Sequence, residues 1–237
     1  MNPGWPMNIG AIRLPSPLSD SDFQQAYARA DLSRQRKIDA YLHRKDKERS
    51  LVGDMLVRLM LFRHFGYVSL KVPFTADRFG KPHLEGQSGM HFNISHAGDW
   101  IVCAVDSSPV GIDVELIRTI DMAVTNHYFS DAEQERLNAV PPENKLSYFF
   151  DLWTLKESYV KAIGKGLSEP LRLFTIDLSV HEIKLISTKK KDTAWKFRQY
   201  EIDRAYKLSI CAAKDSFPYQ VTEVVWDQLL SFYMKER

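Results

Sequence analysis

A long helical segment followed by a group of strands occurs twice along the chain, and this order restricts the fold more than any other feature of the sequence. The first helical segment covers residues 19–65, where Ser19 or Ser21 can cap a first helix and Gly66 follows the last apolar residue. One helix face within it carries apolar residues at the expected spacing: Leu51, Met55, Leu59 and Phe62. The period then changes, and strands are predicted at residues 90–95, 99–106 and 110–116.

The second cycle begins with helical spacing around residues 131–137 and again at 144–163, where the segment ends in the glycines of GKG. Further strands are predicted at residues 174–178, 181–187, 194–202 and 206–213. The lysine-rich stretch TKKKD between two of these strands is predicted to be a solvated hairpin turn.

The two cycles also share a weak sequence similarity. A shift of 108 residues without a gap aligns identical residues, namely Ile94, Ala97, Cys103, Ala104 and Ser108 with Ile202, Ala205, Cys211, Ala212 and Ser216. Chance matches among apolar strand residues could produce some of this similarity. We expect an α+β fold of two similar halves, residues 1–108 and 109–237, with a ligand site between them.

The composition excludes several classes of protein. With 44% hydrophobic and 26% charged residues, the 237-residue chain is typical of a globular protein. The formal net charge of +2 does not indicate a nucleic-acid-binding protein. The opening MNPGWPMNIG lacks the pattern of a secretory signal and no apolar run could span a membrane, so we expect a cytoplasmic protein without a membrane partner. Cys103 and Cys211 lie in apolar runs, which favours buried free thiols.

Two acidic residues interrupt the strand VGIDVEL. Because successive side chains of a strand point to opposite faces, Asp113 and Glu115 share one face while Ile112 and Val114 share the other. The plain explanation is the exposed face of an edge strand, where charges discourage aggregation. A metal site is the alternative.

A second acidic element lies on the helix predicted at residues 144–163. Trp153, Glu157 and Lys161 follow one another at steps of four and therefore project from one side. A surface Glu–Lys pair would explain the two charges, but Trp153 on the same side argues against a fully solvated face. If Glu157 faces the two acids of the strand, the three carboxylates call for a divalent cation, and hard oxygen ligands select Mg²⁺ or Mn²⁺. Magnesium bound by few carboxylates usually also binds substrate phosphates, which points to phosphoryl chemistry.

Groups that could hold phosphates lie elsewhere in the sequence. Lys81 lies on the turn of DRFGKPHL, Arg49 near the start of a helix, and Ser95 and His96 at a strand end. Each also has a structural explanation: a solvated turn for Lys81, a surface ion pair for Arg49 and a core or turn histidine for His96.

Four motifs together resemble the Sfp-type 4'-phosphopantetheinyl transferases. They are FGKPHL, FNISHAGDW, VGIDVE and FFDLWTLKESYVKAIGKGL, and the resemblance extends from about Arg34 to Asp215. It implies a pseudo-twofold α+β fold in which coenzyme A binds between the halves and Mg²⁺ binds three acids.

The resemblance also implies a role for individual residues. The metal ligands fall on Asp113, Glu115 and Glu157, and the coenzyme A contacts on Arg49, Lys81, Ser95, His96 and Lys161. Glu133 of YFSDAE corresponds to a further acid of the family, so the implied catalytic residues are Glu157, Lys161 and Glu133. The basic segment SRQRKID offers Arg34, Arg36 and Lys37 without a secure register.

The implied reaction is transfer of 4'-phosphopantetheine from coenzyme A to a serine of an apo peptidyl or acyl carrier protein, with release of 3',5'-ADP. For a chain of this length the resemblance implies a monomer that serves non-ribosomal peptide or polyketide synthesis, and carrier docking is expected around residues 119–140. Glu157, Glu133 or a metal-bound water could remove the serine proton. A magnesium-dependent phosphohydrolase or nucleotidyl transferase would explain the acids equally well, and a binding module with an inactive cleft is a further alternative.

Overall fold

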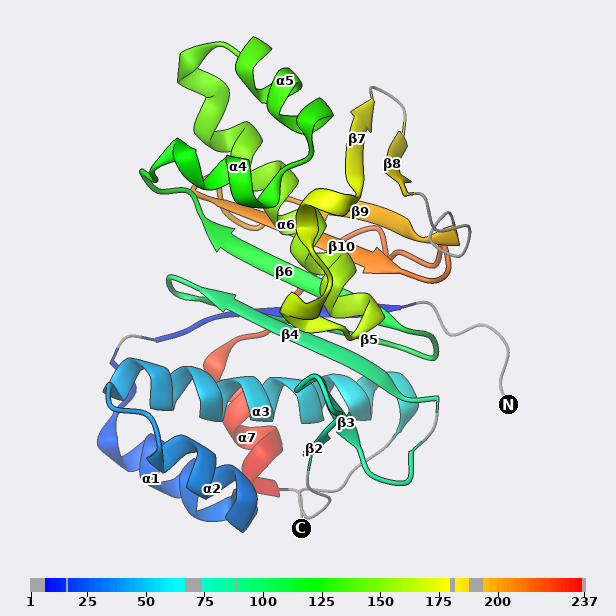
Figure 1. Ribbon diagram of the computed structural model, residues 1–237. Coiled ribbons are helices and arrows are strands. Elements are labelled where there is room, and N and C mark those ends of the chain that lie inside the picture. The colour runs from blue at the N-terminus through cyan, green and yellow to red at the C-terminus, as the bar shows by residue number, and fades with distance from the viewer. Residues whose placement is uncertain are drawn as a thin grey trace.

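A computed structural model of the chain describes residues 7–15, 17–66, 74–87, 89–179, 182–187 and 194–235, and these residues form two main sheets that lie between helices (Figure 1). The hairpin turn expected at residues 188–192 lies outside the described residues.

The first sheet has the strand order β11-β1-β5-β4. Its strands are β1 (Asn8–Arg13), β4 (His91–Ala97), β5 (Trp100–Asp106) and β11 (Thr222–Glu223). β4 and β5 form a tight hairpin whose turn contains Gly98 at φ 54°, a backbone conformation that favours glycine. β1 pairs antiparallel with β5 and parallel with β11, so a late segment of the chain completes the sheet built by its first half.

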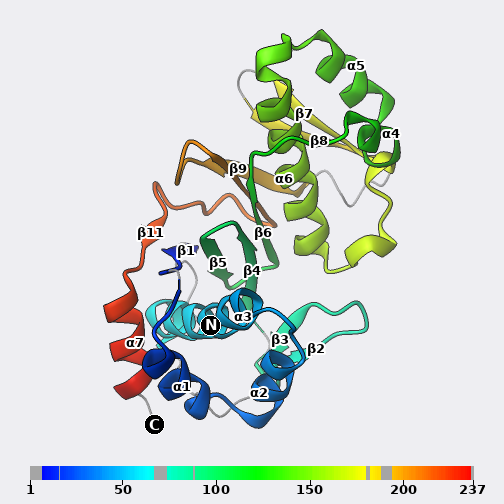
Figure 2. The same cartoon turned by 90° about the vertical axis from the view of Figure 1, so that its left-hand side faces the viewer.

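Helices cover the outer face of the first sheet. Alternate residues of β5, namely Ile101, Cys103 and Val105, are fully buried in the same apolar cluster as helix α3 (Arg44–Phe65). Three further helices pack around α3: α1 (Asp20–Arg29), α2 (Leu32–Asp39) and α7 (Trp226–Lys235). In Figure 2, α7 and β11 lie on the same side of the molecule as β1 and α1. Ser19 caps α1, as expected, by accepting a hydrogen bond from the backbone N–H of Asp22.

The second sheet has the order β6-β10-β9 and is covered by α6. These elements are β6 (Val110–Leu116), β9 (Lys196–Tyr200), β10 (Tyr206–Ala212) and α6 (Lys145–Ile163). Beyond α6 lie α4 (Thr125–Tyr128), α5 (Asp131–Ala139) and the hairpin of β7 (Thr175–Ser179) and β8 (Glu182–Ile186). Short 3-10 turns occupy Met122–Val124, Pro142–Asn144, Gly166–Ser168 and Leu171–Leu173.

The inner faces of the two sheets share one apolar cluster. Ala104 of β5 and Ala212 of β10 both belong to it, whereas the preceding cysteines point outward to the helix of their own half. Cys103 and Cys211 are buried free thiols, as expected. Both long helices end at a glycine in the left-handed conformation, Gly66 at φ 64° and Gly164 at φ 68°. The order of layers is therefore helix, sheet, sheet, helix, and the predicted α+β fold of two similar halves is confirmed.

The two sheets meet where the edge strand β4 lies beside the edge strand β6. Here the side chain of Asn93 accepts a hydrogen bond from the backbone N–H of Ile112 at 2.8 Å. Both residues are buried, so this bond satisfies a backbone donor that would otherwise lack a partner at the junction. Asn93 thus joins the two halves close to Ser95 on β4 and Asp113 on β6.

A small hairpin reaches from the first half to the second. It consists of β2 (Phe74–Ala76) and β3 (Pro82–Leu84), and its turn lies against the C-terminal end of α6, where a Cβ atom on Gly164 would lie 3.1 Å from Cδ of Lys81. This hairpin, α4, β1, β11 and α7 are the helices and strands that the sequence analysis did not predict.

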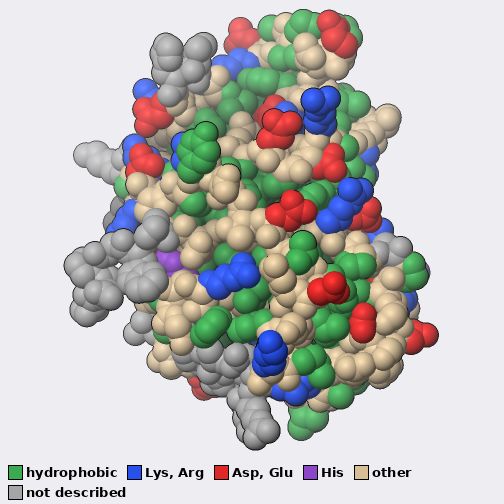
Figure 3. Space-filling view, turned by 180° about the vertical axis from the view of Figure 1, so that it is seen from behind, with side chains coloured by type: hydrophobic (Ala, Val, Ile, Leu, Met, Phe, Trp, Pro, Cys, Tyr) green, Lys and Arg blue, Asp and Glu red, His purple; other side chains and the backbone are tan. Residues whose placement is uncertain are grey.

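No helix among the described residues is both long enough and apolar enough to cross a membrane. On the face seen in Figure 3, acidic and basic side chains are interspersed and no single basic patch dominates. This distribution agrees with the small formal net charge of +2.

Candidate active site

A polar cleft of about 390 Å³ lies where β4, β6 and α6 meet. The residues that line it come from these three elements: Ile94, Ser95, His96, Asp113, Glu115, Trp153, Glu157 and Lys161. The structure therefore brings together six of the residues singled out from the sequence, namely Ser95, His96, Asp113, Glu115, Glu157 and Lys161.

The alternation along β6 turns its acids toward α6. Ile112 and Val114 are buried between the two sheets, whereas Asp113 and Glu115 line the cleft. Gly111 lets the helix approach, because a Cβ atom at this position would lie 2.0 Å from the backbone oxygen of Ser158. The close contact between β6 and α6 sets the width of the cleft.

Helix α6 supplies the opposite wall. Trp153, Glu157 and Lys161 all line the cleft, as their spacing predicts. The ring of Trp153 packs at 5.2 Å from that of Tyr128 and at 5.9 Å from that of Phe149, measured between centroids. These ring contacts hold Trp153, the first of the three cleft residues on α6, in place.

Asp113 lies at the centre of the polar contacts. Its Oδ1 atom accepts hydrogen bonds from Oγ of Ser95 at 2.9 Å and from Nζ of Lys161 at 2.5 Å. Lys161 also donates to Oγ of Ser95 at 2.9 Å. The Oδ2 atom of Asp113 is buried and has no hydrogen-bond partner among the described residues. One carboxylate oxygen therefore remains available to a ligand.

The three carboxyl groups of the cleft all have raised pKa values. Burial raises the pKa of Asp113, and Lys161 partly opposes this effect. Burial and then the charge of Asp113 raise the pKa of Glu115 to about 7, and the same two causes raise the pKa of Glu157. A cation among these groups would stabilise their charged forms.

The donor set fits a hard divalent cation. Carboxylate oxygens are the ligands that Mg²⁺ and Mn²⁺ prefer, and the unpartnered Oδ2 of Asp113 provides one. Within the described ranges of the chain no three Asp, Glu, His or Cys side chains are already gathered around one metal position. A single ion that contacts all three carboxyl groups would therefore need their side chains to change conformation.

Arg49 lies close to the cleft. It donates from Nη2 to the backbone oxygen of Gly98 at 2.6 Å and pairs with Asp46 at 3.1 Å. Burial lowers the pKa of His96, and the positive charges of Arg49 and Lys161 lower it further. The positive charges of Arg49 and Lys161 therefore lie near the end of β4 that carries Ser95 and His96.

Besides Arg49, two other residues assigned by the resemblance lie outside the cleft lining, namely Lys81 and Glu133. Lys81 directs its ammonium group to backbone oxygens at the end of α6, and burial lowers its pKa to about 8, so it still carries a proton at pH 7. Glu133 is fully buried in an ion pair with Lys156 at 2.7 Å. The position of Glu133 gives no support to its expected role as a proton acceptor.

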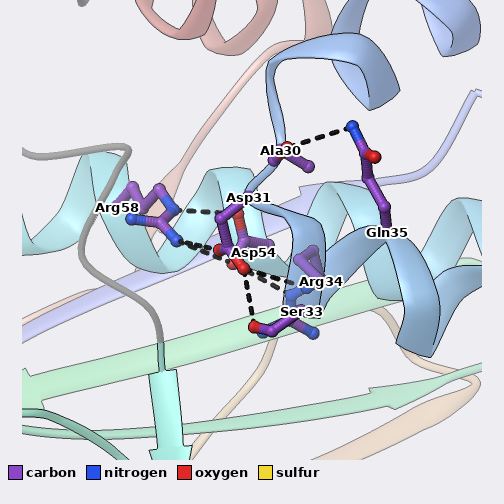
Figure 4. Close-up of polar contacts among 7 residues, drawn as sticks. All are labelled: Ala30, Asp31, Ser33, Arg34, Gln35, Asp54 and Arg58. Atoms are coloured by element: carbon purple, nitrogen blue, oxygen red, sulfur yellow. Dashed lines mark hydrogen bonds and ion pairs between the residues drawn. The ribbon is translucent and has the colours of Figure 1, made fainter.

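The basic segment at residues 33–37 belongs to α2. Figure 4 shows that Arg34 and Arg58 both pair with the buried Asp54, at 3.1 Å and 2.9 Å, and that Arg58 also reaches Asp31 at 3.3 Å. Arg34 is therefore tied to α3, while Arg36 and Lys37 lie on α2 outside the buried core.

Asn93 and Gly111 are the positioning residues that the sequence analysis missed. Asn93 and Ser95 stand two apart on β4, so a polar pair on one strand face was visible in FNIS. The sequence signal for Gly111 was a glycine inside a strand pattern, which often marks close approach of another backbone.

Comparison with known proteins covers both halves of the chain. Residues 109–211 match the family model of the 4'-phosphopantetheinyl transferase superfamily, and residues 16–108 match that of 4'-phosphopantetheinyl transferase, N-terminal. The chain is 34% identical to 4'-phosphopantetheinyl transferase Sfp of Bacillus subtilis (strain 168) over 94% of this chain and 100% of the relative. It is 31% identical to 4'-phosphopantetheinyl transferase gsp of Aneurinibacillus migulanus, over 94% of this chain and 93% of the relative.

Proposed function

The chain belongs to the 4'-phosphopantetheinyl transferases, and from this premise we propose that it transfers 4'-phosphopantetheine from coenzyme A to a serine of an apo peptidyl or acyl carrier protein. The observation that carries the proposal is the cleft in which three carboxyl groups with raised pKa values lie beside Lys161, Ser95 and His96.

The reaction is a displacement at phosphorus. The serine oxygen of the carrier attacks the β-phosphorus of coenzyme A, and the bond from this phosphorus to the bridging oxygen breaks. Phosphopantetheine becomes joined to the serine, 3',5'-ADP leaves with the bridging oxygen, and the serine proton passes to a base. We propose Glu157 as this base, because it lies in the cleft on the wall that α6 supplies.

Asp113, Glu115 and Glu157 are the residues that would hold Mg²⁺, with Mn²⁺ as the alternative. When bound, the ion neutralises pyrophosphate oxygens and orients the leaving group. Glu157 could act as ligand and base in turn only if one of its oxygens stays free. The unpartnered Oδ2 of Asp113 and the raised pKa values of its neighbours support this assignment.

Coenzyme A carries about four negative charges near neutral pH, since a phosphate monoester loses its second proton near pH 6. We propose that Lys161 and Arg49 bind it as cations, with Ser95 and His96 as hydrogen-bonding partners. We assign Lys161 to the pyrophosphate, because its ammonium group lies beside the carboxylate of Asp113. Arg49 and His96 suit the 3'-phosphate end.

We propose that the carrier protein docks on the surface around residues 119–140, because Tyr128 of this segment packs against Trp153 of the cleft. We further propose a cytoplasmic monomer that serves non-ribosomal peptide or polyketide synthesis with broad carrier tolerance. The half 1–108 would then carry Arg49 and His96 for the 3'-phosphate end, and the half 109–237 the metal ligands and Lys161.

The test is intact mass spectrometry of an apo peptidyl carrier protein incubated with this enzyme and coenzyme A, with and without Mg²⁺. We expect a magnesium-dependent gain of one phosphopantetheine and an equal amount of 3',5'-ADP, both lost in D113N. Release of phosphate or pyrophosphate without modification of the carrier would instead indicate a phosphohydrolase or nucleotidyl transferase. Binding of coenzyme A without transfer to several carriers would indicate a binding module.

A further inference from the structure

The turn between β2 and β3 presents Lys81 in a defined direction. Oδ1 of Asp77 accepts hydrogen bonds from the backbone N–H of Phe79 at 2.8 Å and from that of Lys81 at 3.0 Å. The backbone N–H of Asp77 donates to the oxygen of Lys81 at 3.0 Å, and Gly80 takes φ 87°. An aspartate that bonds the backbone of its own turn restricts the conformation of that turn.

The ammonium group of Lys81 makes three hydrogen bonds to backbone oxygens. It donates to Val110 at 3.1 Å, to Lys161 at 2.7 Å and to Ala162 at 3.0 Å. A lysine ammonium has three N–H donors, so these contacts use its whole donor capacity. The side chain in this position has no donor left for a phosphate.

The accepting oxygens lie on two of the three elements that build the cleft, β6 and α6. Lys161 and Ala162 belong to the last turn of α6, where carbonyl groups lack helical partners and the helix dipole is negative. Val110 is the first residue of β6, the strand that carries Asp113. A cation from the hairpin of the first half therefore joins the strand and the helix of the second half.

The contact acts directly on the residue that reaches the cleft. The backbone oxygen of Lys161 bonds to Lys81, while the ammonium group of Lys161 bonds to Asp113 and Ser95. The left-handed Gly164 leaves room for the stem of Lys81, since a Cβ atom there would lie 3.1 Å from Cδ of the lysine.

We infer that Lys81 is a positioning residue, which holds the end of α6 against β6 and so places Lys161 for the reaction, and that its ammonium group does not bind the 3'-phosphate of coenzyme A. The inference rests on the proposed function, because it assigns Lys161 to the pyrophosphate. It departs from the role that the sequence resemblance implies for Lys81.

Lys81→Met tests the inference, because it removes the three donors and keeps an apolar stem. Arg78→Met is the matched control: it removes a cation from the same turn, where the guanidinium lies over the ring of Phe79 at 4.6 Å. Transfer to a carrier protein is measured by mass spectrometry with coenzyme A and with 3'-dephospho-coenzyme A, and thermal unfolding confirms that each variant is folded.

We expect Lys81→Met to lower kcat by about tenfold to a hundredfold, since a misplacement of about 1 Å can cost about a hundredfold. The loss in kcat/KM should be equal for the two substrates, because both contain the pyrophosphate on which Lys161 acts. Arg78→Met should match the wild type. A loss confined to coenzyme A would show that Lys81 contacts the 3'-phosphate, and an unchanged kcat would show that it positions nothing; either result overturns the inference.

If Lys81→Met does not fold, Asp77→Ala takes its place, since it loosens the turn and leaves the lysine present. A folded Asp77→Ala variant with a lower kcat and the same ratio between the two substrates supports the inference, and one with wild-type kcat or a changed ratio overturns it. Absence of transfer by the wild type would instead refute the proposed function, so the two failures are distinguishable.

Discussion

The buried ion pair between Glu133 and Lys156 should make Glu133→Gln strongly destabilising while leaving the chemistry of the folded enzyme intact. Both side chains are 0% exposed, and Nζ of Lys156 lies 2.7 Å from each carboxylate oxygen of Glu133. Each oxygen also accepts one backbone N–H, from Ile176 at 2.7 Å for Oε1 and from Ser130 at 2.8 Å for Oε2. The carboxylate thus accepts four hydrogen bonds.

Glutamine has nearly the same shape but replaces one oxygen by a donor. In either orientation of the amide, Lys156 and one backbone N–H then face an NH₂ group. Two hydrogen bonds to a charged group are lost, at about 1.5–3 kcal/mol each, and Lys156 becomes a buried charge without a counterion. Removing one member of a buried pair costs about 3–5 kcal/mol, and we expect a loss of that size in the free energy of unfolding.

The assay is urea unfolding followed by circular dichroism, combined with kcat measured where each variant is folded. The double variant Glu133→Gln with Lys156→Met is the control, because it removes the stranded ammonium group and should recover some of the loss. Activity should stay within about twofold of the wild type, whereas loss of a general base typically costs about 10²- to 10⁴-fold. A stability loss below about 1 kcal/mol, or a large loss of kcat in the folded variant, would refute the reasoning.

Three further outcomes are expected. Mg²⁺ at about 100 times its dissociation constant should raise the free energy of unfolding by about 2.7 kcal/mol, and Asp113→Asn should abolish the shift in a thermal melt; a shift that survives would remove Asp113 from the metal site. Gly111→Ala should cost about 1–3 kcal/mol or more in urea unfolding, because its Cβ atom would lie 2.0 Å from the backbone oxygen of Ser158, and wild-type stability would contradict this close packing. Asn93→Ala should cost about 1–3 kcal/mol by leaving the buried N–H of Ile112 without its partner, and rapid hydrogen exchange of that amide should accompany the loss.

Local periodicity was sufficient for the acids of the cleft and for Lys161. Asp113 and Glu115 alternate with apolar residues on β6, and Glu157 and Lys161 stand one turn apart on α6, so the backbone geometry alone decides which face they share. That the two faces meet was a hypothesis, from which the need for a divalent cation followed, and the family resemblance supported it.

The partners of buried charged side chains could not be predicted from local periodicity. Lys81 bonds to a residue 80 positions later, and Glu133 pairs with a lysine 23 positions later. Nothing in the local sequence distinguishes such a lysine from a solvated one, because the distinction depends on tertiary packing. The helical spacing of Leu229 and Tyr233 in α7 was visible, but the half to which this helix belongs depends on the pairing of β11 with β1.

The return of the chain to its first half has a consequence for synthesis. Val224, Leu229 and Tyr233 belong to the apolar core around α3, and β11 extends the first sheet beyond β1. The ribosome adds these residues only after the whole of β6–β10 has been made. During translation the second half can therefore complete its core before the first half can, although the first half is made earlier. A nascent chain that stalls before residue 222 would expose the edge of β1 and the apolar side of α3, which are features that chaperones and proteases recognise.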